Sequence, residues 1–187
     1  MVRWEPGARE RLQRAALELF AARGFEQTTA AEIAQSVGLT ERTFFRHFAD
    51  KREVLFYGTH LLVEAFLKGV EAAAPDATPL EVVGSALRSV AAFFPDDRRP
   101  YSRTRQAVIN QNPALQEREL RKMAELTRVI HGALLARGLT DPTAALAAEL
   151  ARTVFGIAFG EWIGDGEQRS LDVIQADLLR RLRDLTG

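Results

Sequence analysis

The sequence predicts an all-α protein of about nine helices, arranged as a three-helix head and a larger helical bundle. Apolar residues recur at helical spacing along most of the 187-residue chain, and no segment shows the two-residue alternation of a strand. The seven prolines fall between these periodic segments, where they do not interrupt a helix. Because 47% of the residues are apolar, the chain can bury a substantial core.

The first predicted helix spans residues 6–23. Its buried face is marked by an apolar stripe with helical spacing: Leu12, Ala15, Ala16, Leu19 and Phe20. Gly24 follows directly and is expected to end the helix, with Phe25 folding back onto the stripe.

Residues 28–51 predict two short helices joined by a tight turn. Thr29 and Glu32 have the spacing of a capping box at the start of the first helix. Gly38 is expected to end that helix, and Thr40 to cap the second. A helix, a glycine turn and a second helix within this length form the helix-turn-helix arrangement, which inserts its second helix into the major groove of DNA.

The second of these short helices carries two arginines on one face. Arg42 and Arg46 are four residues apart, and Thr43 lies beside them. One arginine side chain can bond O6 and N7 of guanine together, which is worth about 1–3 kcal/mol of discrimination between bases. Three phenylalanines are expected on the inward side of this helix: Phe44, Phe45 and Phe48.

Three runs within residues 9–56 resemble the DNA-binding half of the TetR family of transcriptional regulators. These runs are ALELFAARGFEQTT, AAEIAQSVGLT and FFRHFADKREVLF. The resemblance implies an all-helical homodimer that binds an operator with inverted half-sites and holds a small effector in a variable C-terminal domain. Residues 1–50 are therefore the predicted helix-turn-helix DNA-binding domain, and residues 51–187 the predicted effector-binding and dimerisation domain.

The predicted DNA contacts fall into two groups. Bases are assigned to Arg42, Thr43 and Arg46, and phosphates to Thr29, Thr40, His47 and Lys51. Phe45 belongs to the same interface, but it departs from the family pattern. The family usually has a tyrosine there, whose hydroxyl often meets a backbone phosphate, and a phenylalanine has no such hydroxyl.

Six further helices are expected to form the body. Their predicted ranges are 51–74, 79–94, 101–111, 113–137, 143–163 and 171–185. The first of them is predicted to be one long helix that links the head to the body and carries conformational change between them.

A set of aromatic, aliphatic and polar residues on these helices is the candidate effector pocket, since the resemblance implies a cavity there. Its members are Leu62, Phe66, Phe93, Arg105, Ile109, Met123, Leu126, Thr127, Ile130, Phe155, Phe159 and Trp162. For each apolar member the alternative is a place in an ordinary core, and for Arg105 and Thr127 it is a surface position or a buried position with its hydrogen bonds satisfied. The run from residue 103 to 120 is similar to an actinobacterial subgroup, some of which sense acyl thioesters, so an apolar or amphipathic effector is expected.

The last two predicted helices carry the candidate dimer interface. Gly156, Gly160 and Gly164 are spaced by four, and a glycine inside a helix costs about 1 kcal/mol against alanine, so a close approach of another backbone should offset it. On the final helix Leu171, Ile174, Leu178 and Leu182 form an apolar seam suited to a four-helix bundle. The alternative is that the glycines make room inside the subunit for packing or a ligand.

Composition limits the remaining classes of function. Without cysteine the chain has no disulfide and no thiolate metal site, and the three histidines are far apart, so we expect no metal, no cofactor and no enzymatic activity. Lys plus Arg and Asp plus Glu are equal at 25 each, which alone does not indicate nucleic acid. No 18-residue stretch is free of charge and no signal region is visible, so a cytoplasmic protein without a membrane span is expected.

These observations predict a transcriptional repressor that binds a palindromic stretch of double-stranded DNA as a homodimer and is released by a small effector. Two alternatives remain open. One is a helical DNA-binding protein that has no effector, and the other is a helical scaffold or enzyme.

Overall fold

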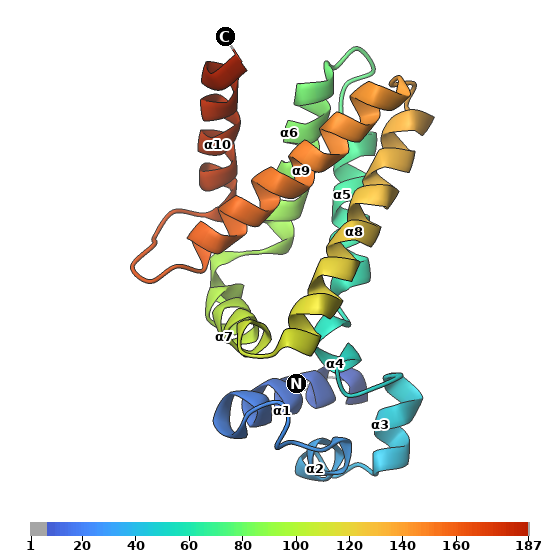
Figure 1. The fold of residues 1–187 in the computed structure, drawn as a ribbon, viewed down its shortest axis with the longest axis vertical. Coiled ribbons are helices and arrows are strands. Elements are labelled where there is room, and N and C mark those ends of the chain that lie inside the picture. The colour runs from blue at the N-terminus through green and yellow to red at the C-terminus, as the bar shows by residue number, and fades with distance from the viewer. Residues whose placement is uncertain (1–6, 187) are drawn as a thin grey trace, which may run out of the picture. The chain divides into compact units, whose positions relative to one another are not determined.

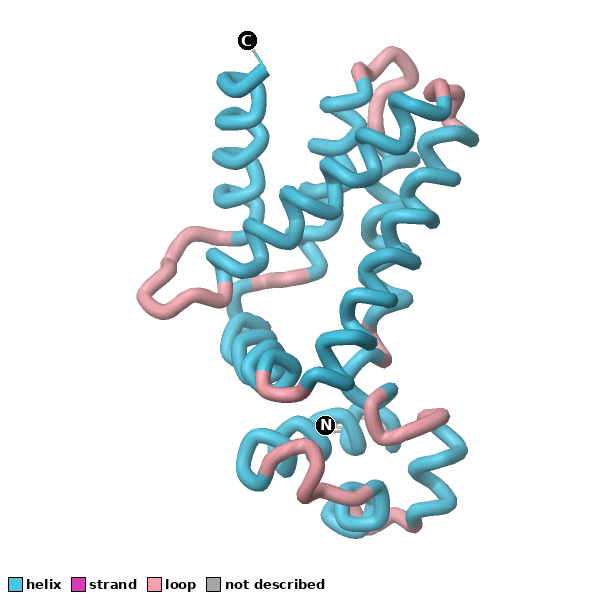
Figure 2. The backbone as a smooth tube through the Cα atoms, in the orientation of Figure 1, coloured by secondary structure: helices cyan, strands magenta, loops and turns pink. Residues whose placement is uncertain are grey.

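The computed structural model describes residues 7–186, and it confirms the all-α fold: these residues form ten α-helices and one short 3-10 helix, with no strand (Figure 1, Figure 2). Residue 6, the predicted start of the first helix, lies outside the described residues. The elements are α1 (Ala8–Arg23), α2 (Ala30–Ser36), α3 (Glu41–His47), α4 (Glu53–Phe56), α5 (Thr59–Ala72), α6 (Pro79–Phe93), the 3-10 helix (Asp96–Arg98), α7 (Arg99–Asn110), α8 (Pro113–Ala136), α9 (Asp141–Trp162) and α10 (Leu171–Thr186).

The helix predicted for residues 51–74 is two helices, which accounts for the tenth. Helix α4 ends at Phe56 and α5 begins at Thr59, so the prediction of one continuous helix was wrong. Glycine is a poor helix former, and no atom lies within 4 Å of where a side chain at Gly58 would begin. Gly58 lies in the two-residue break between the two helices.

The chain divides into two compact units, and their boundary differs from the predicted one at residue 50. The first unit comprises Met1–Gly58 with Thr104–Glu119, and the second comprises Thr59–Arg103 with Leu120–Gly187. The later segment joins the first unit because its apolar side chains Val108, Ile109 and Leu115 are buried in that unit's core. Helical periodicity in the sequence shows that such residues are buried, but not against which partner.

The core of the first unit is built on the apolar stripe of α1. Leu12 and Ala16 are 0% exposed and Phe20 is 2% exposed. Helix α1 packs against α2 and α4, and α2 packs against α3. The ring of Phe25 lies against the edge of Phe20, with 5.0 Å between ring centroids, which confirms the fold-back predicted after Gly24. This small core positions α3.

The second unit is organised around the close approach of α5 and α6. A side chain added at Gly69 would begin 2.5 Å from Cα of Ala86 and 2.6 Å from the carbonyl oxygen of Ser85, so only glycine fits there. Helix α9 crosses α6, and α10 packs against both (Figure 1). Burial of apolar side chains between these helices forms the core of this unit.

Helix α9 is the one described helix that is long and apolar enough to cross a membrane by length and composition. Its inward face belongs to the core of the second unit, where Ala148, Ala151 and Trp162 are each 0% exposed. The same helix also places apolar side chains outward, with Leu146 73% and Ile157 50% exposed. Its apolar character therefore comes from two faces, and only one of them is covered within the subunit.

The contact at Gly69 gives a prediction about stability. Gly69→Ala is expected to lower the free energy of unfolding by about 1–3 kcal/mol, because the new methyl group would overlap backbone atoms of α6. Gly132→Ala in α8 is the matched control, since that position is exposed and open, and it should raise stability by up to about 1 kcal/mol. Thermal unfolding at equal protein concentration measures both. Equal changes in the two variants would contradict the packing described here.

Candidate nucleic-acid interface

The start of α2 is fixed by the predicted capping box, which the structure confirms. The Thr29 side-chain oxygen accepts from the Glu32 backbone N–H at 3.2 Å, and the Thr29 backbone N–H donates to Glu32 Oε2 at 2.8 Å. The bonds that Thr29 donates, from its backbone and then its hydroxyl, lower the pKa of the Glu32 carboxyl. Thr29 is exposed but its hydroxyl is engaged within the cap, so its predicted phosphate contact stays a prediction.

The turn and the cap that follow set the direction of α3. Gly38 has a φ of +71°, a conformation that suits glycine, and the Leu39 N–H donates to the Ala34 carbonyl oxygen at 2.9 Å. The Thr40 side chain then accepts from the Thr43 N–H at 3.2 Å, which confirms it as the cap of α3. The hydroxyl oxygens of Thr40 and Thr43 lie 3.0 Å apart and share a hydrogen bond. The two hydroxyls predicted to contact DNA, Thr40 at a phosphate and Thr43 at a base, are therefore bonded to each other in the free protein.

Two of the three phenylalanines of this segment face the core, and the third does not. Phe44 is 0% and Phe48 3% exposed, whereas Phe45 is 50% exposed. The prediction that Phe45 lies on the inward side was therefore wrong. Consecutive helical residues are about 100° apart, so Phe44 and Phe45 cannot both face the same core. Phe45 remains part of the predicted interface, on its outward side.

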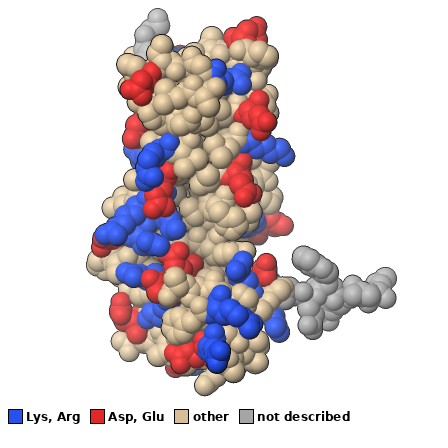
Figure 3. All heavy atoms as spheres, turned by 90° about the vertical axis from the view of Figure 1, so that its right-hand side faces the viewer, with Lys and Arg blue, Asp and Glu red and all other residues tan. Residues whose placement is uncertain are grey.

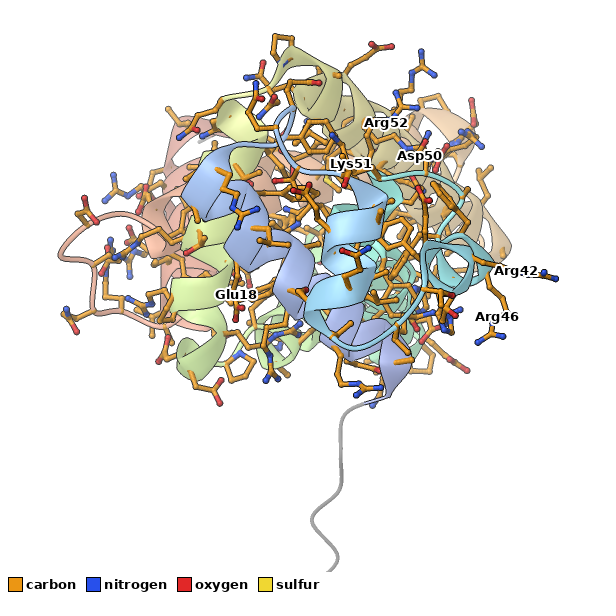
Figure 4. The ribbon with its side chains drawn as sticks, turned by 90° about the horizontal axis from the view of Figure 1, so that it is seen from below. Glu18, Arg42, Arg46, Asp50, Lys51 and Arg52 are labelled. Atoms are coloured by element: carbon orange, nitrogen blue, oxygen red, sulfur yellow. The ribbon has the colours of Figure 1, made fainter. Side chains whose placement is uncertain are left out.

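Arg42 and Arg46 project from the outward side of α3, as Figure 4 shows. Both side chains are exposed, and neither makes an ion pair or hydrogen bond with any residue among 7–186. Their guanidinium groups are therefore not neutralised by the protein's own carboxylates. On the face drawn in Figure 3, basic and acidic side chains are interspersed. The surface of α3 is therefore distinguished by two unpaired arginines and not by an excess of positive charge over the whole protein.

Lys51 has a structural role that the sequence did not reveal. Its ammonium donates to the carbonyl oxygens of Phe25 at 2.7 Å and Thr28 at 2.9 Å, and it lies 4.0 Å from the centroid of the Phe25 ring. These bonds tie the segment before α4 to the turn before α2. Only one N–H of the ammonium remains for the predicted phosphate contact.

The far end of α3 brings His47 close to Arg9, a residue that sequence reasoning missed. Arg9 donates to the Tyr57 hydroxyl at 2.9 Å, and its guanidinium lies 4.6 Å from the Tyr57 ring centroid. Burial, and then the charges of Arg9 and Arg46, lower the pKa of His47 below its ordinary value. Nε2 of His47 is buried without a partner among the described residues, so a phosphate contact must use the other ring nitrogen.

The predicted effector residues fall into both units. All but Arg105 and Ile109 belong to the second unit, where Phe66, Phe155 and Trp162 lie in the core. Arg105 is in the first unit and already donates to the Leu55 carbonyl oxygen at 2.9 Å and to Glu119 at 3.2 Å. Ile109 is 0% exposed in the core of the same unit, so the structure gives both residues other partners. Three of the remaining predicted members are buried in the core of the second unit: Leu62, Leu126 and Ile130. Three others are partly buried against that core: Phe93, Met123 and Phe159. Met123 also lines an open groove between α8 and α9, together with Thr127.

A cluster of aromatic rings lies within the largely aliphatic interior of this unit. The Phe94 ring centroid lies 5.3 Å from that of Phe159 and 5.9 Å from that of Trp162, and the Trp162 indole donates to Asp96 at 3.0 Å. Sequence reasoning missed Gln175, which is 1% exposed. Neither polar atom of its side-chain amide has a partner among the described residues. A glutamine within an otherwise apolar helical seam was the signal that could have revealed it.

The candidate dimer residues also divide into two groups. Gly156 and Gly160 are exposed on α9 with open space around them, so they do not make room inside the subunit. Leu171 and Ile174 are 1% and 0% exposed within the subunit's own core, so the structure gives them partners inside the subunit, and their place in a dimer interface stays a prediction. An amphipathic seam must be covered, but its spacing does not say whether the covering helix belongs to the same chain. Leu178 and Leu182 are half-buried on the same helix.

Residues 7–58 and 104–119 thus present a capped helix-turn-helix whose second helix carries two unpaired arginines, which is the geometry of a DNA-binding protein. Within residues 7–186, no cluster of three or more His, Asp or Glu side chains could hold a metal ion.

The family described as "Bacterial regulatory proteins, tetR family" matches residues 12–57, and the family described as "MftR C-terminal domain" matches residues 77–186, more than half of the chain.

The chain therefore belongs to the TetR family, with a C-terminal domain of the MftR type, and it is a DNA-binding transcriptional regulator rather than an enzyme. It is 45% identical to the HTH-type transcriptional regulator TcmR of Streptomyces glaucescens over 82 residues, which cover 44% of this chain and 36% of TcmR. It is 28% identical over 158 residues to MftR of Mycobacterium tuberculosis, whose name refers to regulation of mycofactocin biosynthesis, covering 80% and 77% of the two chains.

A solved structure resembles the whole fold. The Thermus thermophilus transcriptional repressor FadR, crystallised with lauroyl-CoA, is 25% identical to this chain and has a TM-score of 0.55. The match covers 94% of this chain and 93% of FadR.

Arg46 is exposed without a partner among the described residues, whereas Lys51 bonds two backbone carbonyl oxygens, so their substitutions should have different effects. Arg46→Ala is expected to weaken binding by about 5- to 150-fold for each half-site of the cognate DNA, the equivalent of losing one bidentate base contact in each, without changing stability. Lys51→Met is expected to lower the free energy of unfolding by about 1–3 kcal/mol, because two carbonyl oxygens lose a charged donor. Fluorescence anisotropy and thermal unfolding measure the two effects.

Arg128→Ala is the control for these variants, because Arg128 is an exposed arginine on α8 in the second unit and should leave DNA affinity unchanged. If Arg46→Ala lost the same affinity on random-sequence DNA, Arg46 would contact phosphate and not a base.

Proposed function

We propose that this regulator is a ligand-responsive repressor, which binds a palindromic operator as a homodimer in the cytoplasm and is released by a small apolar or amphipathic effector. The observation that carries this proposal is the pair of exposed, unpaired guanidinium groups on α3. Together with the caps at Thr29 and Thr40, they form a surface suited to the major groove.

The outward face of α9 supports the homodimer. Gly156 and Gly160 lie on this face, with no atom within 4 Å of where a side chain at either position would begin, and Ile157 beside them is 50% exposed. Two glycines one turn apart let another helix approach closely, and covering Ile157 removes apolar surface from water. In such a dimer the two α3 helices would enter successive major grooves, about 34–36 Å apart.

The interior of the second unit supports an apolar effector with a polar end. Small-molecule sites are mostly apolar with a few polar groups. This unit contains a cluster of aromatic rings, and the buried amide of Gln175 has one donor and one acceptor group without partners among the described residues. Leaving such groups unsatisfied costs about 1–3 kcal/mol, which a ligand could recover. The lauroyl-CoA in Thermus FadR makes acyl thioesters the first class of ligand to test.

Release of DNA requires only that the effector favour one conformation over another. A ligand that binds the DNA-free conformation more tightly shifts the population towards it, and such coupling is typically about 1–3 kcal/mol. The effector therefore does not need to contact α3.

The proposal is tested by selecting bound DNA from a random pool with the full-length protein and then adding candidate ligands. We expect the selected sites to be inverted repeats, and lauroyl-CoA to release them where CoA alone does not. Release is followed by anisotropy of labelled DNA. If no ligand of this class releases the DNA while binding stays intact, the protein is a regulator without an acyl effector. If no inverted repeat is enriched, the repressor proposal fails.

The dimer gives a separate prediction. Gly160→Leu should convert the protein to a monomer, because the new side chain would hold the partner's helix away from α9. Gly132→Leu is the matched control, since Gly132 is also exposed and open but lies on α8, and this variant should remain a dimer. Sedimentation velocity distinguishes the two states. A Gly160→Leu protein that still sediments as a dimer would refute the close approach at this glycine.

A further inference from the structure

Phe45 presents an aromatic ring to solvent on the recognition helix α3. The side chain is 50% exposed, although a phenylalanine gains stability from burial. Its ring meets the ring of Phe44 edge-on, with 5.4 Å between centroids and 83° between planes. Phe44 is 0% exposed, so the exposed ring packs against a ring of the core.

The ring shares the outward side of α3 with the two unpaired arginines. Phe45 lies three residues after Arg42 and directly before Arg46, so the helix places it within about 60° of Arg42. A surface that Arg42 approaches is therefore also within reach of the ring, which lies about 100° from Arg46 around the helix. A surface that binds only phosphates would gain nothing from a phenyl ring, which has no hydrogen-bond donor and no charge.

The floor of the DNA major groove offers one apolar group to such a ring. Among the four base pairs, only those with thymine present a methyl group there, and phenylalanine is one of the side chains that contact it. Arginines beside the ring would meanwhile bond guanine O6 and N7. The outward side of α3 therefore combines groups for two different bases.

We propose that Phe45 is a specificity-determining residue that packs against the C5-methyl group of a thymine in each half-site of the operator. This inference rests on the proposed binding of α3 in the major groove. It gives Phe45 a role in selecting sequence, in addition to the guanine contacts assigned to Arg42 and Arg46.

Energetic reasoning sets the size of the effect. Burying one methyl group is worth about fourfold in affinity, so a methyl contact in both half-sites is worth about 15-fold. Phe45→Ala should abolish this preference with little change in stability, because half of the ring is exposed in the free protein.

The test replaces each thymine of a selected site with deoxyuridine, which removes the methyl group and keeps the base pairing. Wild-type protein is expected to lose about fourfold in affinity at one position per half-site and to be unaffected at the others. Phe45→Ala should bind the thymine and deoxyuridine sites equally, and Arg128→Ala should behave as wild type. Anisotropy titrations on each duplex measure these affinities.

Two results would overturn this inference while leaving the proposed function intact. One is a selected site in which the wild-type protein is insensitive to the substitution at every thymine. The other is a methyl effect that persists in Phe45→Ala, which would assign the contact to another side chain. Failure to select any palindromic DNA would instead overturn the proposed function, and this inference with it.

Discussion

The burial of Phe44 beneath α3 is the constraint on which the interface depends. Because this ring is 0% exposed and Thr40 caps the helix behind it, α3 can face outward only with the side that carries Arg42 and Arg46. Neither guanidinium has an acidic partner among the described residues, so both keep their donors for a ligand. A hydrophobic contact and a cap thus decide which charges the protein presents, although its net charge is zero.

The second unit shows a similar separation of faces on α9. Its inward face carries small alanines and Trp162 within the core, and its outward face carries Gly156 and Gly160 in open space. By length and composition α9 could span a membrane. A partner helix packed against its uncovered face would account for the same apolar composition. The amide of Gln175, unpartnered among the described residues, is a different feature, because it lies inside the subunit, where a second copy of the chain could not reach it.

Features set by neighbouring residues could be predicted from the sequence, and features set by distant ones could not. The cap at Thr40 and the arginine pair on α3 depend on spacings of three and four residues, and the structure has them as expected. The outward position of Phe45 could not be assigned from the sequence, because either Phe44 or Phe45 has the right spacing to share the buried face of the helix with Phe48. Lys51 bonds carbonyl groups from 23 and 26 residues earlier, which no local spacing reveals. Leu171 lies in a seam whose covering helix only the tertiary structure identifies.

The central claim about this protein is that α3 reads guanines through Arg42 and Arg46. Methylation interference on a selected operator tests it directly, because methylating guanine N7 removes the acceptor that an arginine needs. We expect methylation of at least one guanine in each half-site to prevent binding of the wild-type protein, and the same guanine to have no further effect in the matching arginine-to-alanine variant. If no guanine in the site shows interference, the two arginines do not read bases and the claim is contradicted.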